Sequence, residues 1–64
     1  MKIQGLRLSQ NMTQDTLAEQ LGVTRSTIAM WETGKAMPRA DKLPEIAKVL
    51  GCNVSDLFEK EEAV

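Results

Sequence analysis

Apolar residues return along this chain at the three- and four-residue spacing of amphipathic helices, in short runs separated by glycine, proline or a capping residue. The runs predict five short helices: Lys2–Gln10, Gln14–Leu21, Arg25–Thr33, a fourth that Asp41 caps and Gly51 ends, and a short fifth that Asn53 caps. The residues expected on the inner faces are Ile3, Leu6, Leu17, Ala18, Leu21, Ile28, Trp31, Leu43, Ile46, Ala47 and Leu50. No strand pattern or repeat appears, so the expected fold is a compact all-α domain over residues 1–58, followed by a charged, frayed tail at 59–64.

Three of these helices begin in the same way, with a capping residue placed between two apolar residues that can pack across the helix start. The caps and their apolar pairs are Thr13 with Met12 and Leu17, Thr24 with Val23 and Ile28, and Asn53 with Cys52 and Leu57. Gly22 ends the second helix, so a three-residue turn joins the second helix to the third. A plain bundle of three or four helices would need longer helices and no tight glycine turn, which makes it the weaker alternative.

Composition narrows the chemistry that the chain can perform. The 64 residues contain one cysteine, no histidine and no tyrosine, so an intramolecular disulfide and the commonest acid–base catalyst are excluded. No nucleophile–base pair can be assembled from the remaining residues, and we expect neither an enzyme nor a site for a metal, cofactor or small molecule. No apolar run approaches the roughly 18 residues that span a membrane, and the first residues lack the apolar segment of a secretory signal, which predicts a cytoplasmic protein.

The charges are unevenly distributed along the chain. The net charge of −1 argues weakly against a nucleic-acid partner. Residues 1–40, however, hold five cationic side chains against three acidic ones, whereas residues 41–64 hold three against six. The front of the chain is therefore mildly basic and the rear acidic, and the overall charge hides this polarity.

A helix, a short turn beginning with glycine and a second helix form the DNA-binding helix-turn-helix unit. The run TQDTLAEQLGVTRSTIAMWETGKAMP resembles this unit in the Cro/phage-repressor family, often called the XRE family. The matching positions are Leu6-Arg7, Thr13-Gln14, Leu17-Ala18, Leu21-Gly22-Val23-Thr24, Ile28, Trp31-Glu32, Gly34, Pro38, Ile46-Ala47, Leu50-Gly51 and Leu57. One departure is Thr16, which stands where the family often has a glutamate. The resemblance implies a five-helix, lambda-repressor-like domain that binds operator DNA, usually as a dimer.

The resemblance also implies which residues meet DNA, with the helix from Arg25 to Thr33 entering the major groove. The positions that correspond to base contacts are Arg25, Ser26, Ala29 and Met30. Those that correspond to phosphate contacts are Gln14, Thr27, Thr33, Lys35 and Arg39. Among the first group, Arg25 can offer two donors to guanine O6 and N7, while Ala29 and Met30 suit a thymine methyl. The family pairs the positions of Arg7 and Glu32 in a largely buried ion pair, so we expect these two residues to be structural.

The leading hypothesis is therefore a sequence-specific regulator of transcription, with repression as the expected outcome. One small domain makes few phosphate contacts, so two copies on a palindromic operator are expected, with Val54 and Phe58 as candidate dimer contacts carried from relatives. The alternative is a helix-turn-helix domain that binds another protein, such as an antitoxin whose acidic rear meets a basic partner. The absence of acidic residues from the predicted recognition face favours DNA.

Overall fold

The computed structural model describes residues 1–58, so the predicted tail at 59–64 lies outside the described residues. The elements are the helices α1 (Ile3–Ser9), α2 (Gln14–Leu21), α3 (Arg25–Thr33), α4 (Leu43–Leu50) and α5 (Val54–Leu57), with a 3-10 turn, η1 (Ala40–Lys42), before α4. Within residues 1–58 there is no strand, and the predicted all-α, five-helix fold is confirmed. In this same part of the chain, no helix combines the length and apolarity needed to cross a bilayer.

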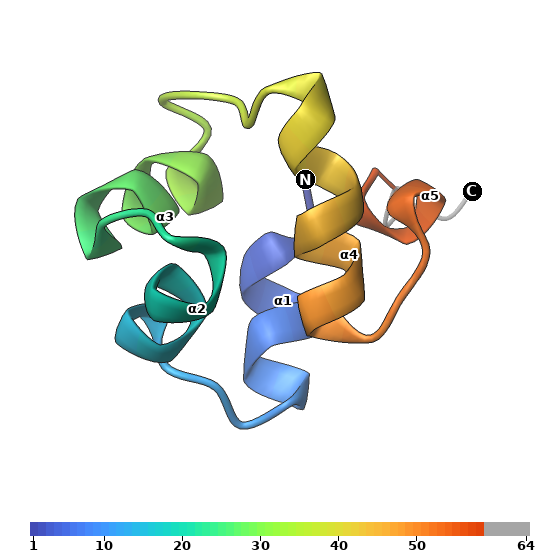
Figure 1. The fold of residues 1–64 in the computed structure, drawn as a ribbon, viewed down its shortest axis with the longest axis horizontal. Coiled ribbons are helices and arrows are strands. Elements are labelled where there is room, and N and C mark those ends of the chain that lie inside the picture. The colour runs from blue at the N-terminus through green and yellow to red at the C-terminus, as the bar shows by residue number, and fades with distance from the viewer. Residues whose placement is uncertain (59–64) are drawn as a thin grey trace.

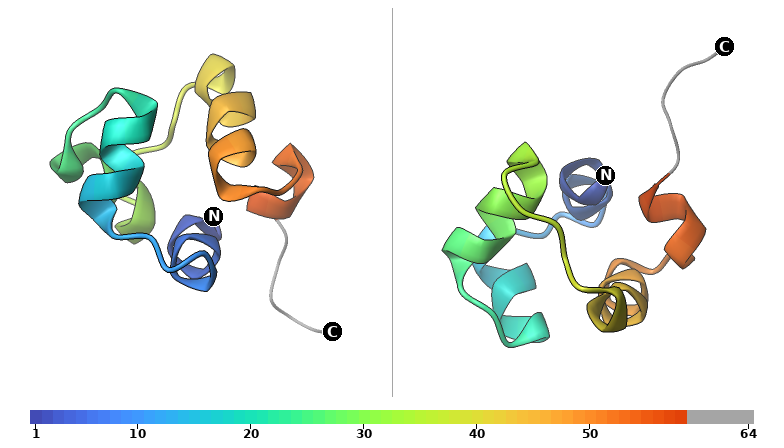
Figure 2. Two further views of the ribbon diagram at one scale, coloured as in Figure 1. Left: turned by 60° about the horizontal axis from the view of Figure 1, so that its bottom comes forward. Right: turned by 90° about the horizontal axis from the view of Figure 1, so that it is seen from above.

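The helices form one cluster in which α2 and α3 lie together on one side and α5 lies on the opposite side (Figure 1). Helices α1 and α4 stand between them, and the other views show the same order (Figure 2). The chain start is tied to α5, because the Lys2 amide donates to the Leu57 carbonyl at 2.9 Å. This arrangement leaves the α2–α3 pair free to present one face outward.

The core is built from the apolar residues that the sequence pattern placed inward. Its buried members are Ile3, Leu17, Ala18, Leu21, Ile28, Trp31, Ile46, Ala47, Leu50 and Leu57. The partly buried Leu6, Met12, Val23, Leu43 and Cys52 pack against them, so each predicted apolar pair at a helix start has both members in or against the core. Burial raises the pKa of the Cys52 thiol, and the nearby Asp56 carboxylate raises it further, which keeps the thiol neutral and suits a packing role.

The start of α4 differs from the prediction. Asp41 does not cap α4; it lies in the 3-10 turn, and its exposed carboxylate is 3.9 Å from the Arg39 guanidinium. The Lys42 amide donates to the Arg39 carbonyl, and the Leu43 amide donates to the Ala40 carbonyl. The preceding turn therefore supplies hydrogen-bond acceptors for backbone amides at the start of α4, a task that a side-chain cap would otherwise perform. Pro44 does lie in the first turn of α4, as expected.

Candidate nucleic-acid interface

The turn between α2 and α3 begins with Gly22, whose φ of 71° lies in the left-handed region that favours glycine. Two threonine caps then set the starts of the helices: the Thr13 hydroxyl accepts from the Thr16 amide at 3.0 Å, and the Thr24 hydroxyl accepts from the Thr27 amide at 3.2 Å. Thr16, which replaces the family's glutamate, instead pairs its hydroxyl with that of Thr13 at 3.0 Å. Both helix starts are therefore held by a threonine pair.

Helix α3 presents two different faces. Ile28 and Trp31 are buried and attach the helix to the core. On the outward side, Arg25, Ser26, Met30 and Thr33 are exposed, and Thr27 and Ala29 are half-buried. The helix has one acidic residue, Glu32, and its side chain is only 2% exposed. The outward face of α3 is thus uncharged apart from one arginine.

Glu32 is buried in an ion pair with Arg7 of α1, at the position where the family resemblance places one. Arg7 Nε donates to Glu32 Oε2 at 2.7 Å and Arg7 Nη2 donates to Oε1 at 3.3 Å, a bidentate pair. Arg7 Nη1 also donates to the Met12 carbonyl at 2.8 Å, which holds the segment leading into α2. The described residues include no buried polar side-chain atom without a hydrogen-bond partner, so no buried donor or acceptor of this pair is left unpaired.

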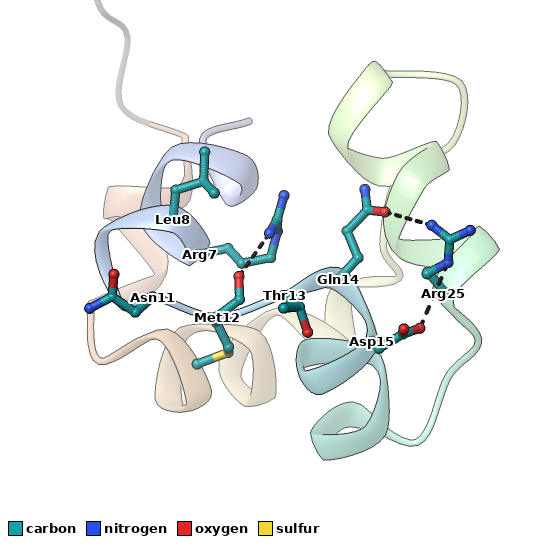
Figure 3. A pocket seen from close by; sticks show the side chains of 8 residues that line it. All are labelled: Arg7, Leu8, Asn11, Met12, Thr13, Gln14, Asp15 and Arg25. Carbon is teal, nitrogen blue, oxygen red and sulfur yellow. Dashed lines mark hydrogen bonds and ion pairs between the residues drawn. The ribbon is translucent and has the colours of Figure 1, made fainter.

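Gln14 connects this buried pair to Arg25 at the start of α3. Its Nε2 donates to Glu32 Oε1 at 3.0 Å. Its Oε1 accepts from Arg25 Nη1 at 3.3 Å, a contact that Figure 3 shows. A carboxylate can only accept and a guanidinium can only donate, so the two partners determine which way the Gln14 amide is oriented. The chain of contacts from Arg7 to Arg25 is therefore continuous.

Arg25 has a second partner that the sequence did not predict. Asp15 Oδ1 lies 3.7 Å from Arg25 Nε, and Figure 3 shows the guanidinium between Gln14 and Asp15. These residues border a shallow, open depression of about 540 Å³ between α1, the start of α2 and the start of α3. No spacing rule links Asp15 to Arg25, because the contact exists only once α2 and α3 are packed.

Of the predicted phosphate-contact residues, Thr27 and Thr33 lie within α3, and the other three lie near its two ends. Gln14 is held beside the N-terminal end of α3 by its hydrogen bond with Arg25. Lys35 and the exposed Arg39 follow the C-terminal end of α3. A nine-residue helix is about 14 Å long, so cationic or donor groups flank α3 over that distance.

The two predicted threonines are partly committed within the protein. The Thr33 hydroxyl donates to the carbonyls of Ala29 and Met30 at 3.0 and 3.3 Å, and the Thr27 hydroxyl pairs with that of Thr24 at 3.0 Å. To donate to a phosphate, the Thr33 hydroxyl would have to rotate away from these two carbonyls.

Comparison with known proteins agrees with this geometry. A family model described as helix-turn-helix matches residues 3–57. The chain is 41% identical over 63 residues to the HTH-type transcriptional activator BcrR of Enterococcus faecalis, a match that covers 98% of this chain and 31% of the activator. It is 39% identical over 61 residues to an HTH-type transcriptional regulator of Methanocaldococcus jannaschii, covering 95% of this chain and 92% of that protein.

A phage protein is a more distant relative. The cryptic phage CTXphi transcriptional repressor RstR of Vibrio cholerae is 28% identical over 61 residues, covering 95% of this chain and 55% of the repressor. No solved structure matches the chain significantly. Relatives named as activator and as repressor share the domain, so the domain itself does not specify the direction of regulation. The chain belongs to the Cro/phage-repressor (XRE) type of helix-turn-helix DNA-binding transcriptional regulators.

Proposed function

We propose that this protein binds double-stranded DNA sequence-specifically by inserting α3 into the major groove, with Arg25, Ser26, Ala29 and Met30 at the base edges. The observation that carries the proposal is the outward face of α3, which has a single arginine and no exposed acid. Small or neutral side chains let a helix approach the bases closely, and an arginine at its first turn can meet guanine O6 and N7.

The phosphate contacts proposed to fix the register of the helix are Gln14, Thr27, Thr33, Lys35 and Arg39. Gln14 is supported by its position as the first residue of α2, where free amides and the positive end of the helix favour an anion. Lys35 and Arg39 are supported by their exposure beyond the other end of α3. Contacts on both sides of the groove would orient α3 without reading sequence.

We further propose that two copies bind one palindromic operator. A single small domain makes few phosphate contacts, whereas two recognition helices about 34 Å apart occupy two half-sites on one side of the duplex. The proposed dimer contacts are Val54 and Phe58 of the α5 segment, residues that are 36% and 47% exposed. Exposed apolar groups on the element farthest from α3 are suited to pairing two copies with both recognition helices facing DNA (Figure 1).

Repression is the regulatory outcome that we propose, because a protein occupying an operator blocks access to it without any further contact. RstR, a relative named as a repressor, supports this direction. BcrR, a relative named as an activator, makes activation the competing outcome. A reporter gene placed behind the selected operator would distinguish the two, since repression lowers its expression and activation raises it.

The experiment that tests DNA reading is selection of bound duplexes from a random pool. We expect an enriched palindrome, and we expect Arg25→Ala to weaken binding to it by about 1–3 kcal/mol while relaxing the preference at one guanine. Arg39→Ala is the matched control, because loss of a phosphate contact weakens binding to all duplexes about equally and lowers the salt slope by about 1. No enrichment at low salt would contradict the proposal and favour the protein-binding alternative.

A further inference from the structure

The surface that we assign to DNA contains one acidic side chain with a specific partner, Asp15. Its carboxylate is 81% exposed and lies 3.7 Å from Nε of Arg25, itself 63% exposed. An acid in the first turn of a helix stabilises that helix through the helix dipole, which explains a carboxylate at this position. The dipole does not explain why the carboxylate meets the one arginine on the outward face of α3.

The contacts of Arg25 leave part of its hydrogen-bonding capacity available. A guanidinium carries five N–H donors, and here Nε faces Asp15 while one Nη1 hydrogen is given to Gln14. Both hydrogens of Nη2 and the second hydrogen of Nη1 remain, and a bidentate contact with guanine needs one from each nitrogen. Asp15 and Gln14 therefore restrain the guanidinium without using the donors that a guanine requires.

The charge of Arg25 is offset by the same contact. Attraction of an arginine to DNA phosphates depends on its net charge, and a carboxylate 3.7 Å away largely cancels that charge at distances longer than the separation of the two groups. Reading of a guanine depends instead on short hydrogen bonds, which the carboxylate leaves intact. Sequence-independent binding is thus weakened while base reading is kept.

We propose that Asp15 is a specificity-determining residue, which positions the Arg25 guanidinium for a guanine and suppresses its attraction to phosphates where no guanine is present. The inference rests on the proposed function, because it assumes that Arg25 reads a base. Specificity is a difference between two affinities, and Asp15 increases that difference mainly by weakening the binding of the wrong sequence.

The test measures binding of the full chain to two duplexes, the selected operator and the same duplex with the guanine facing Arg25 replaced. Asp15→Asn removes the charge with little change in shape, and we expect the ratio of the two affinities to fall by about 2- to 5-fold, the range of an exposed ion pair. The fall should come from tighter binding to the replaced duplex. Asp15→Glu should keep at least half of the discrimination and leave thermal unfolding nearly unchanged, because it keeps the negative charge in the first turn of α2. Asp15→Asn should lower the midpoint of thermal unfolding only slightly, because it loses that charge.

Glu19→Gln is the matched control, since Glu19 is also exposed on α2 and has no ion pair among the described residues. We expect it to change both affinities by the same factor and leave their ratio unchanged. If Glu19→Gln lowers the ratio as much as Asp15→Asn does, or if Asp15→Asn leaves the ratio unchanged, Asp15 is only one of several surface charges and the inference is overturned.

The Arg25→Ala variant separates failure of this inference from failure of the proposed function. If Arg25→Ala removes the preference for the guanine but Asp15→Asn does not alter it, the proposed function stands and the role of Asp15 is wrong. If Arg25→Ala leaves the preference unchanged, the proposed reading by Arg25 is itself wrong. NMR relaxation of the Arg25 Nε–H in the free protein adds a measurement without DNA: Asp15→Asn should increase its motion and Glu19→Gln should not, and equal motion in both would contradict the positioning role.

Discussion

Two arginine–carboxylate pairs lie on either side of Gln14, and they differ in almost every respect. In the inner pair, Arg7 Nε lies 2.7 Å from Glu32 Oε2, and the two side chains are only 8% and 2% exposed. In the outer pair, Arg25 Nε lies 3.7 Å from Asp15 Oδ1, and most of each side chain is exposed to solvent. Gln14 touches a member of each pair, donating to Glu32 and accepting from Arg25.

The comparison shows how depth decides what an ion pair does. A buried charge that loses its partner has no water to replace it, so the inner pair is tied to folding. An exposed pair costs little to form or to break, so the outer pair can restrain Arg25 without being required for folding and leaves the arginine available to DNA. The same chemical groups therefore stabilise the domain at one end of this network and are available for binding at the other.

The largest expected effect comes from breaking the inner pair. Glu32→Gln leaves the Arg7 guanidinium buried without a countercharge, and we expect a loss of about 3–5 kcal/mol in the free energy of unfolding, measured by urea denaturation. The double replacement Arg7→Met with Glu32→Leu removes both charges and should recover most of that loss. If Glu32→Gln lowers the free energy of unfolding by less than about 1 kcal/mol, the inner pair contributes no more than an exposed ion pair does. That result would contradict the distinction between the buried and the exposed pair.

Removal of the connecting residue should have an intermediate effect. Gln14→Ala deletes one hydrogen bond to a buried carboxylate and one to an exposed arginine, for an expected loss of about 1–2 kcal/mol in stability, measured in the same way. It should also weaken operator binding, because Arg25 loses one restraint. Gln20→Ala, at an exposed position of the same helix, is the control and should change neither quantity measurably. Equal effects of the two variants would show that Gln14 does not connect the pairs.

Breaking the outer pair should have the smallest effect on folding. Arg25→Ala should change the free energy of unfolding by no more than about 0.5 kcal/mol, although it abolishes the proposed guanine contact. Arg39→Ala, which breaks the exposed Arg39–Asp41 pair, should be equally neutral for stability. A loss of 2 kcal/mol or more (about the range of a buried hydrogen-bonded charge) for Arg25→Ala would mean that this residue supports the fold rather than a contact with DNA.

The sequence predicted most of the fold because its determinants are local. Periodicity and threonine caps located α2 and α3 to the residue, and Gly22 located the turn between them. The prediction that Asp41 caps α4 was wrong for a different reason. Carbonyls of the 3-10 turn segment accept hydrogen bonds from the amides that lead into α4, so no side-chain cap is needed there. No side-chain pattern in the sequence distinguishes those two ways of starting a helix.

The candidate site was predictable in part. The family resemblance indicated Arg7 with Glu32, and the structure contains that pair. It gave no reason to single out Asp15, whose importance depends on an orientation of α2 against α3. Contacts between residues far apart in the sequence follow from packing, and no local propensity encodes them.

Helix positions, inward faces and the acid-free outer side of α3 were set by the order of residues, because each depends on neighbours within about one helical turn. The connected chain from Arg7 through Glu32 and Gln14 to Arg25 and Asp15 was decided by tertiary structure. Three helices must meet before these five side chains come within reach. Packing also set the depth of each charge, and depth separates the pair that holds the domain together from the pair on the surface that we propose meets DNA.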